Sequence, residues 1–354
     1  MATFVIAAGG TAGHVVPAVA VADALRADGA RVVFVGGERA EAELVPQAGY
    51  ELRPIAVQGL SRTNPLRAAR AVLKAGAAVR AAGAILRDVR PDAVMGGGGY
   101  VAGPVGLAAL LRRIPLVLTE ADSHLGLANR LLAGRARRVC LAFPIAGRDG
   151  DRYLVTGRPV PAPTTDRAAA RARFGLGESD TCVLVFGGSL GARSINEAAV
   201  DAFAGAPYRV LHVAGTRDFA ALAARLGSPP PAGYDLREYI QPFGDVLAAC
   251  DLCVARAGGS IFEIAAAGRP AILVPYPHAA GDHQTSNARW MGDAGAAVVV
   301  GDYALTPQRM RAEVDALLAD PGRLRAMAAA SASLARPNAA REVAQELWAA
   351  AGAA

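Results

Sequence analysis

Short apolar runs, many of them β-branched, alternate along this 354-residue chain with longer stretches rich in Ala, Leu and Arg. This alternation is typical of strands followed by helices, and it predicts parallel sheets covered by helices on both faces. The expected fold class is therefore α/β. We expect strands at residues 3–8, 31–35, 93–95, 116–119 and 138–141 in the first half, and at 182–186, 209–213, 252–255, 271–274 and 296–300 in the second.

The two halves of the chain open with the same pattern. An apolar run at residues 4–8 leads into Gly-Gly-Thr-Ala-Gly, and a second run at residues 182–186 leads into Gly-Gly-Ser-Leu-Gly. In both places a predicted strand is followed by a glycine loop and then by a predicted helix. We therefore expect two Rossmann-like domains that face a central cleft. The proline-rich segment 157–163 is the natural linker between them.

Composition and charge narrow the possible functions. With 53% hydrophobic and 19% charged residues, the chain can bury large cores and does not resemble a disordered protein. Its longest uncharged apolar stretch, residues 95–111, is interrupted by glycines and a proline, so no membrane-spanning helix is expected. The first residues lack a basic region, so no signal peptide is expected. A net charge of +6 favours an anionic partner, and a nucleic acid, a membrane surface and a diphosphate all qualify.

A Cys-x-x-Cys pair at Cys250 and Cys253 raises the question of a metal site. The pair lies on an apolar run that is typical of a buried strand, and no second pair or histidine cluster completes a zinc site. We therefore expect reduced, buried thiols and no bound metal.

Glycine-rich loops are the first candidates for ligand binding. Glycine allows the backbone to approach a ligand closely, and the helix that follows offers free N–H groups and a positive dipole end. Such loops stand at residues 9–13, 95–100 and 187–191. One glycine loop can be no more than a tight turn, but three at strand ends favour phosphate binding.

A dinucleotide site is the competing interpretation of the middle loop. Gly97-x-Gly99-x-x-Ala102 matches the G/A form of that fingerprint, and Glu120 follows the next strand at a suitable distance. However, the loop follows a late strand, and a run of four glycines makes a chance match easy. The chain has no GxxxxGK[ST] motif, which argues against a P-loop kinase or ATPase.

A predicted helix near residue 260 offers a second type of site. Gly259 and Ser260 begin this helix, so its N-terminus can receive a diphosphate. Glu263 lies one turn further on, where a carboxylate can accept hydrogen bonds from two vicinal ribose hydroxyls. Ser260-x-x-Glu263 is also a capping box, in which both side chains serve only the helix end.

Several segments together resemble one family, that of MurG, the UDP-N-acetylglucosamine transferases that complete the lipid-linked precursor of peptidoglycan. The resemblance covers essentially the whole chain. Its donor-site signature matches residues 258–270, 275–278 and 281–288, and its other motifs match residues 9–17, 97–104 and 187–192.

The resemblance implies a GT-B architecture, in which two Rossmann domains work without a catalytic metal or cofactor and the anomeric centre is inverted. It also implies that a final helix, at about residues 338–351, packs back on the first domain. The expected domains are an acceptor-binding, membrane-facing domain of residues 1–158 plus 338–354, and a UDP-sugar-binding domain of residues 159–337.

The resemblance also assigns roles at the donor site. Ser189 and Arg256 would lie at the diphosphate, Ile240 and Phe243 would line the uracil pocket, Glu263 would hold the ribose, and Gln284 and Asn287 would read the sugar hydroxyls. The expected donor-binding residues are Thr11, Gly13, Arg158, Ser189, Ile240, Phe243, Arg256, Gly259, Ser260, Glu263, Gln284 and Asn287.

His14 is the natural general base for the acceptor, because it directly follows the first glycine loop. Its alternative role is a histidine that only packs at a helix start, and Glu120 and Asp122 compete as the base. Where the family has Glu-Gln-Asn, this chain has Glu-Ala-Asp at 120–122, and Arg158 would replace an arginine that the family carries slightly further along. The expected acceptor-binding residues are Gly10, Gly98, Gly99, Tyr100, Glu120 and Asp122.

A predicted helix at residues 66–87 has a basic face. Its apolar stripe would pack on the core, while Arg67, Arg70 and Lys74 lie together on another face. These charges form either an ordinary solvated surface or a site for anionic lipid headgroups. The resemblance favours a peripheral enzyme on the cytoplasmic face of the cell membrane, with no nucleic-acid partner.

The leading function implied by the resemblance is transfer of N-acetylglucosamine from UDP-N-acetylglucosamine to the 4-hydroxyl of the muramyl sugar on an undecaprenyl diphosphate. Two alternatives remain. One is a UDP-N-acetylglucosamine 2-epimerase-like isomerase, which would need no acceptor. The other is a non-catalytic subunit that binds a nucleotide sugar.

Overall fold

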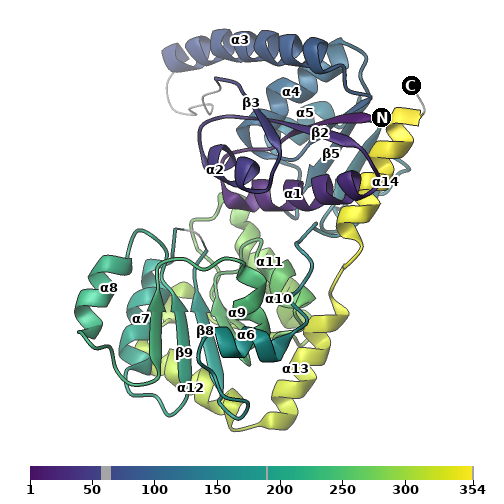
Figure 1. Ribbon diagram of the computed structural model, residues 1–354. Coiled ribbons are helices and arrows are strands. Elements are labelled where there is room, and N and C mark those ends of the chain that lie inside the picture. Colours follow the sequence, from purple (N-terminus) through teal and green to yellow (C-terminus); the bar gives the residue numbers. More distant parts are fainter. Residues whose placement is uncertain (57–64, 189, 353–354) are drawn as a thin grey trace. The chain divides into compact units, whose positions relative to one another are not determined.

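The computed structural model describes residues 1–56, 65–188 and 190–352, and within these ranges all side chains except those of residues 65–75 and 280. The chain divides into two compact units, Met1–Pro161 with Arg336–Ala354, and Ala162–Ala335. Each unit is built on one parallel sheet flanked by helices (Figure 1), so the predicted α/β fold with two Rossmann-like sheets is confirmed.

The first unit contains a seven-stranded sheet with the order β3-β2-β1-β4-β5-β6-β7. Every strand pair in it is parallel. The strands are β1 (Thr3–Ala7), β2 (Arg31–Gly36), β3 (Glu51–Pro54), β4 (Ala93–Gly96), β5 (Leu116–Glu120), β6 (Arg138–Leu141) and β7 (Tyr153–Val155), and the helices are α1 (Ala12–Ala27), α2 (Ala40–Gln47), α3 (Pro65–Val89), α4 (Gly99–Leu111), α5 (Leu127–Leu132) and α14 (Ala339–Gly352).

Apolar side chains fill both faces of this sheet. On one face α1 and the C-terminal α14 pack side by side, and Trp348 of α14 meets Phe4 of β1 edge-on at 5.0 Å between ring centroids. On the other face α3 and α4 contribute Leu86 and Val105 to a second cluster. The central strands are buried on both faces, which explains their continuous apolar runs.

The second unit contains a six-stranded parallel sheet with the order β10-β9-β8-β11-β12-β13, and a large apolar cluster packs within it. Its strands are β8 (Cys182–Phe186), β9 (Arg209–Val213), β10 (Tyr234–Arg237), β11 (Leu252–Ala255), β12 (Ala271–Leu273) and β13 (Ala297–Val299). Its helices are α6 (Arg167–Arg173), α7 (Arg193–Phe203), α8 (Phe219–Leu226), α9 (Phe243–Ala249), α10 (Ile261–Ala266), α11 (His283–Asp293), α12 (Pro307–Leu318) and α13 (Pro321–Ser333), with short 3-10 turns at Ala280–Asp282 and Asp302–Ala304.

All the strands expected from sequence are present, but three further strands were missed. These are β3, β7 and β10, and each lies at an edge of its sheet. Edge strands are short and partly exposed, and none of these three is an uninterrupted buried run. They therefore lack the apolar signal on which the prediction depended.

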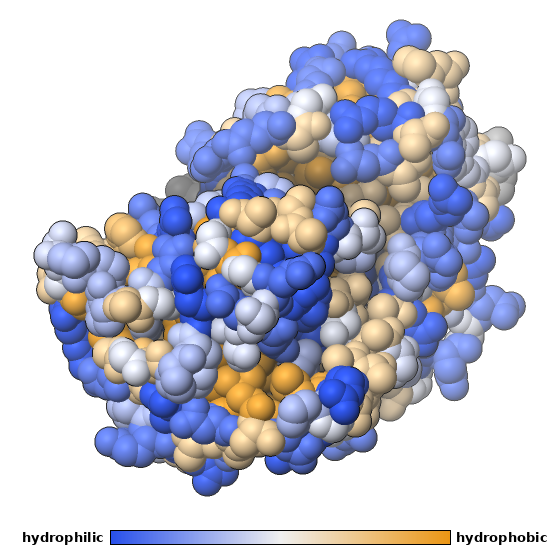
Figure 2. Space-filling model, turned by 60° about the horizontal axis from the view of Figure 1, so that its bottom comes forward, coloured by the Kyte–Doolittle hydropathy of each residue, from blue (hydrophilic) through white to orange (hydrophobic). Residues whose placement is uncertain are grey.

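The cysteines behave as structural thiols. Cys250 and Cys253 are fully buried where α9 ends and β11 begins, with their sulfur atoms 3.7 Å apart, and all four cysteines are free. Within the described residues, no group of three or more His, Cys, Asp or Glu side chains is arranged to hold a metal ion. Among the same residues, no helix has the length and apolar character needed to span a membrane. The face in Figure 2 is largely hydrophilic with smaller apolar areas between.

Candidate active site

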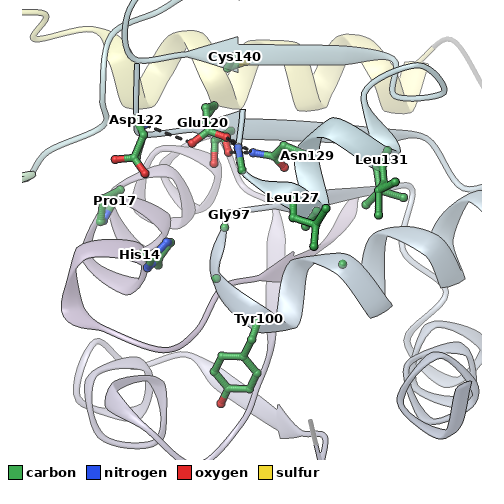
Figure 3. A pocket seen from close by; sticks show the side chains of 18 of the residues that line it. His14, Pro17, Gly97, Tyr100, Glu120, Asp122, Leu127, Asn129, Leu131 and Cys140 are labelled. Carbon is green, nitrogen blue, oxygen red and sulfur yellow. Dashed lines mark hydrogen bonds between the residues drawn. The ribbon is translucent and has the colours of Figure 1, made fainter. Parts of the chain in front are cut away.

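A cavity of about 960 Å³ lies in the first unit. It opens where β4 and β5 end and where α1 and α4 begin (Figure 3). The strand order reverses between β1 and β4, and ligands of open α/β sheets bind at the carboxyl ends of strands beside such a switch point. The volume is also that of a small-molecule site, at about 300–1,000 Å³.

Two glycine loops form one wall of this cavity. The first precedes α1 and the second precedes α4, and they touch backbone to backbone. A Cβ on Gly99 would lie 1.8 Å from the carbonyl oxygen of Gly9, so only glycine permits the contact. Gly10 and Gly98 adopt φ of 112° and 90°, a region that favours glycine.

Both helices that follow these loops lack a side-chain cap. Thr11 and Gly98 occupy the N-cap positions of α1 and α4, and neither helix receives a hydrogen bond from a capping side chain. The first N–H groups of each helix are then open to a ligand, and the helix dipole adds positive potential. The wall formed by Gly13 and by Gly97–Gly99 is therefore suited to an anion such as a diphosphate.

His14 lies in the first turn of α1 and lines the cavity. Its ring lies against Gly98, where a Cβ would come within 2.5 Å of the imidazole, and its Nδ1 is 3.3 Å from the Thr11 hydroxyl. Burial lowers the pKa of His14 below its usual 6.5, and the positive charge of Arg158 lowers it further, against the opposing effects of Asp122 and Glu41. His14 is therefore neutral at neutral pH, as a general base must be.

Glu120 ends β5 on another side of the same cavity (Figure 3). Its carboxylate accepts hydrogen bonds from the backbone N–H of Gly126 at 2.8 Å, from that of Asp122 at 3.2 Å and from the Asn129 amide at 2.9 Å. Burial is the main reason why the pKa of Glu120 is raised, and the nearby Asp122 adds to the effect. Glu120 therefore holds the turn after β5 in shape, and its oxygens are already engaged.

Asp122 and Arg158 complete the polar part of the cavity. Asp122 is half-buried, and its carboxylate forms no hydrogen bond with another described side chain or backbone group. Arg158 is buried, and its guanidinium donates to the carbonyl oxygen of Gly13 in the first glycine loop. The structure thus places Arg158, expected at the donor, beside His14 in the first unit.

Tyr100 lines the cavity, but its hydroxyl points elsewhere. Figure 3 shows its ring pointing away from His14 and Glu120. The hydroxyl donates to Glu41 of α2 at 2.6 Å. Glu41 and Asn129 were not identified from sequence. Glu41 lies among the charged residues Glu38, Arg39 and Glu43, where it looks like part of a solvated helix face.

The opposite end of the cavity is apolar. Leu107 and Leu111 of α4 and Leu127 and Leu131 of α5 line it, with 42%, 70%, 42% and 69% of their surfaces exposed. Four large apolar side chains this exposed around one opening are unusual for a soluble surface. The cavity therefore joins an anion-binding wall to an apolar mouth.

The second unit holds the other expected loops. Gly191 packs so closely that a Cβ would lie 2.0 Å from the Ala214 carbonyl oxygen, and α7 begins after it without a side-chain cap. Ser189 lies outside the described residues. Gly259 and Ser260 precede α10, but the Ser260 side chain forms no capping hydrogen bond, so the capping-box alternative lacks its serine half. Glu263 is half-buried in the first turn of α10.

The amides of Gln284 and Asn287 in α11 contact the segment around α10. Gln284 accepts from the backbone N–H of Tyr276 at 2.9 Å and lies near Gly258. Asn287 is buried and donates to the Ala257 carbonyl at 2.9 Å. Both amides therefore hold backbone turns of this unit in place.

Arg256 and the expected uracil-pocket residues are tied into the same unit. Arg256 is buried, forms an ion pair with Asp302 at 2.5 Å and donates to the Ser194 hydroxyl at 2.8 Å. Phe243 begins α9 and packs edge-on against Phe186 at 4.9 Å, and Ile240 is buried nearby in the sequence.

Comparison with known proteins identifies the family of this chain. The model for the glycosyltransferase family 28 N-terminal domain matches residues 4–141, and that for the C-terminal domain of the same family matches residues 182–345. A UDP-N-acetylglucosamine–N-acetylmuramyl-(pentapeptide) pyrophosphoryl-undecaprenol N-acetylglucosamine transferase of Moorella thermoacetica is 42% identical and covers 96% of this chain and 97% of its own length. The enzyme of that name from Halorhodospira halophila is 40% identical, with 97% and 96% covered.

Solved structures agree with this assignment. The crystal structure of Acinetobacter baumannii MurG has a TM-score of 0.76 and 30% identity and covers 99% of this chain and 100% of its own. A UDP-GlcNAc 2-epimerase from Neisseria meningitidis has a TM-score of 0.68 at 15% identity, which indicates a shared fold alone. With both domain models matched and relatives of about 40% identity over nearly the full length, the chain belongs to glycosyltransferase family 28 and, within it, to the MurG family.

Proposed function

We propose that this enzyme transfers N-acetylglucosamine from UDP-N-acetylglucosamine to the 4-hydroxyl of the muramyl sugar on a lipid-linked diphosphate. Family membership supports the reaction type. The observation that carries the proposal is one cavity in the first unit, where a neutral histidine lies between two uncapped helix N-termini and an apolar mouth. A lipid-linked diphosphate sugar matches this cavity, because it offers a diphosphate to the helix N-termini, a sugar hydroxyl to the histidine and a lipid chain to the apolar mouth.

The acceptor diphosphate binds at the N-termini of α1 and α4, where Gly13, Gly98 and Gly99 present their backbone to the cavity. The muramyl sugar then lies beside His14. The acceptor oxygen forms a new bond to the anomeric carbon, the bond from that carbon to UDP breaks, and the hydroxyl proton passes to His14. General-base assistance of this kind typically contributes about 10²–10⁴-fold.

His14 suits the role of base better than either nearby carboxylate. The oxygens of Glu120 accept three hydrogen bonds, so moving toward a substrate would leave those donors unpaired. Asp122 raises the pKa of His14 and is placed to stabilise the imidazolium that forms when the proton is taken. We assign Asp122 this electrostatic role.

The donor binds in the second unit. The loop before α7 and the segment at Gly259 and Ser260 receive the diphosphate, Glu263 holds the ribose, and Phe243 and Ile240 lie at the base. Backbone N–H groups and helix dipoles then stabilise the charge that develops on the departing UDP. On this account the transfer needs no metal ion.

The apolar mouth and a neighbouring basic hollow support contact with a membrane surface. The hollow has a volume of about 690 Å³ and shares Leu110 and Arg135 with the cavity described above. Arg138 pairs with Glu346 at 2.6 Å, whereas within the described residues the other arginines of the hollow form no ion pair. Its charged lining consists of Arg113, Arg135, Arg137, Arg138, Arg152 and Asp151.

We propose that the exposed leucines and this hollow rest on the headgroups of an anionic leaflet, on the cytoplasmic side where the UDP-sugar is available. The basic side chains expected to act similarly, Arg67, Arg70 and Lys74, lie outside the described side chains.

One experiment separates the transferase from its alternatives. The protein is incubated with UDP-N-acetylglucosamine, with and without a lipid-linked muramyl acceptor. The transferase releases UDP only with the acceptor. Formation of the 2-epimer without acceptor would identify an isomerase, and binding of UDP-sugar without either product would identify a non-catalytic subunit.

A further inference from the structure

The geometry points to Glu41 as a positioning residue that clamps the two glycine loops of the acceptor cavity together. The inference rests on the proposed acceptor site and adds a residue that lines no part of the cavity. Glu41 lies in the first turn of α2 and is completely buried, which is rare for a glutamate.

Three segments of the chain donate to this one carboxylate. The backbone N–H of Gly10 donates to one oxygen at 2.8 Å. The backbone N–H of Gly37 and the hydroxyl of Tyr100 donate to the other, at 2.9 Å and 2.6 Å. Gly10 belongs to the loop before α1, Gly37 follows β2, and Tyr100 lies in the first turn of α4. Glu41 therefore joins the loops that carry both uncapped helix N-termini.

Three glycines pack closely against Glu41 and Tyr100. A Cβ on Gly9 would lie 2.7 Å from a Glu41 carboxylate oxygen, and one on Gly36 would lie 2.8 Å from its Cγ. A Cβ on Gly37 would lie 2.0 Å from the Tyr100 hydroxyl. A larger residue at any of these glycines would therefore displace the Glu41 or Tyr100 side chain from its present position.

The clamp depends on the charge of Glu41. Burial by itself raises the pKa of this carboxyl, but the hydrogen bonds from Tyr100, Gly10 and Gly37 outweigh it, so the pKa lies below its usual value. Burial and the bond to Glu41 raise the pKa of Tyr100 to about 12, so the phenol remains a donor. A glutamine of the same shape has one NH₂ group, which would face an N–H donor and lose a contact.

A substitution of Glu41 should change acceptor binding indirectly, by displacing the two glycine loops. Gly9 touches Gly99, and Gly98 touches the His14 ring, so a shift at Gly10 or Tyr100 displaces both the anion-binding wall and the base. Glu41 does not meet the acceptor itself. Its loss should therefore weaken acceptor binding first and leave UDP-sugar binding in the second unit intact.

The test compares Glu41→Gln and Tyr100→Phe with the matched control Glu43→Gln. Glu43 is in the same helix and is exposed, and among the described residues its carboxylate accepts a hydrogen bond only from Gln47. For Glu41→Gln we expect the KM for lipid-linked muramyl acceptor to rise about 10- to 100-fold, the size of effect of lost charge-assisted hydrogen bonds. The KM for UDP-N-acetylglucosamine should stay within about twofold, and Glu43→Gln should match the wild type.

A double variant and amide exchange separate the clamp from direct binding by Tyr100. If the phenol acts through Glu41, adding Tyr100→Phe to Glu41→Gln raises the acceptor KM no further. The backbone N–H groups of Gly10 and Gly37 should exchange with solvent faster in Glu41→Gln than in the Glu43→Gln control.

An unchanged acceptor KM in Glu41→Gln would overturn the clamp, and so would equal losses of donor and acceptor binding. If Glu41→Gln does not fold, Tyr100→Phe decides, because an unchanged acceptor KM in that variant contradicts the inference equally. Failure of the proposed function is a separate result, since the wild type itself would then show no acceptor-dependent UDP release.

Discussion

Each unit of this protein contains a histidine whose pKa is lowered by burial, and the two histidines, His14 and His212, differ in what surrounds them. His14 is half-buried, faces a cavity and has the charges of Arg158 and Asp122 near it. His212 of β9 is completely buried, with Nδ1 2.7 Å from the Tyr234 hydroxyl and Nε2 3.1 Å from the Asn196 side-chain oxygen. Both of its nitrogens are occupied by the protein itself.

Burial lowers the pKa of both histidines, and that of His212 falls to about 3. A lowered pKa is therefore no sign of catalysis by itself. The difference lies in access, because only His14 adjoins a cavity that can admit a substrate. In the proposed mechanism, His14 therefore serves the chemistry. His212 instead helps to hold a loop, since its partner Asn196 also donates to the Ala214 carbonyl beside Gly191.

The largest expected effect comes from removing the accessible histidine. His14→Ala should lower kcat by about 10²–10⁴-fold because the acceptor hydroxyl loses its base. Affinity for UDP-N-acetylglucosamine should remain near that of the wild type, because the proposed donor site lies in the other unit. Steady-state kinetics and calorimetry measure the two quantities. Near-normal turnover in His14→Ala, with turnover lost in Asp122→Ala, would transfer the role of base to the carboxylate.

A substitution in the proposed donor site should weaken donor binding and leave the acceptor kinetics nearly unchanged, the reverse of the pattern expected for His14→Ala. Glu263→Ala should weaken UDP-N-acetylglucosamine binding by about 1.5–3 kcal/mol, because charge-assisted hydrogen bonds to the ribose are lost. The acceptor KM should change little. Titration calorimetry with the donor gives the answer, and an unchanged affinity would remove Glu263 from the site.

Removing the enclosed histidine should affect stability rather than chemistry. His212→Leu removes the partner of the Tyr234 hydroxyl and of the Asn196 side-chain oxygen. It should lower the free energy of unfolding by about 1–3 kcal/mol, while kcat of the folded enzyme is retained. Acid should destabilise the wild type. In the unfolded chain His212 is protonated below about pH 6.5, whereas in the folded chain its pKa is about 3. Stability from this group is thus complete above about pH 6.5 and falls by up to ~1.4 kcal/mol per pH unit below it. Urea unfolding at several pH values should show a shallower acid loss in His212→Leu, and an identical loss would contradict the assignment.

The basic hollow should contribute a smaller, additive effect. Replacing Arg135 and Arg137 by Ala should weaken binding to vesicles with anionic lipids by about 30-fold, at ~1 kcal/mol per charge. The control is Arg323→Ala with Arg325→Ala, since these arginines are also exposed and two residues apart but lie on α13 of the second unit. Equal losses of vesicle sedimentation in both pairs would show that total charge, and not the hollow, is responsible.

Metal removal should have no effect. EDTA should leave kcat unchanged, because in the proposed mechanism backbone N–H groups and helix dipoles stabilise the departing diphosphate. Activity that disappears with EDTA and returns with magnesium or manganese would require a metal in the donor site.

The features that could be predicted from the sequence are those marked by long apolar runs and by glycine loops. The central strands, both glycine loops of the first unit and the position of His14 at the start of α1 all followed from local pattern. The edge strands β3, β7 and β10 did not, because their exposed residues produce no apolar period. Glu41 was missed for a related reason. Its importance depends on Gly10 and Tyr100, which are 31 and 59 residues away and become neighbours only in the folded sheet.

The roles of the amides Gln284 and Asn287 show another limit. The resemblance placed both at the sugar, and the fold shows them bonded to the backbone around Ala257 and Tyr276. An amide serves a turn or a ligand with the same chemistry, so residue type alone does not distinguish the two. Their contact with the sugar stays a prediction.

The pH dependence of acceptor kcat/KM tests the central claim most directly. If His14 is the base, kcat/KM should rise with pH through one ionisation below about 6.5 and reach a plateau at neutral pH, because burial and Arg158 lower the pKa of His14. In His14→Ala, kcat/KM should be much lower at every pH and should no longer show this ionisation. In Glu120→Gln the ionisation should remain. A profile that keeps its ionisation in His14→Ala and loses it in Glu120→Gln would contradict the account.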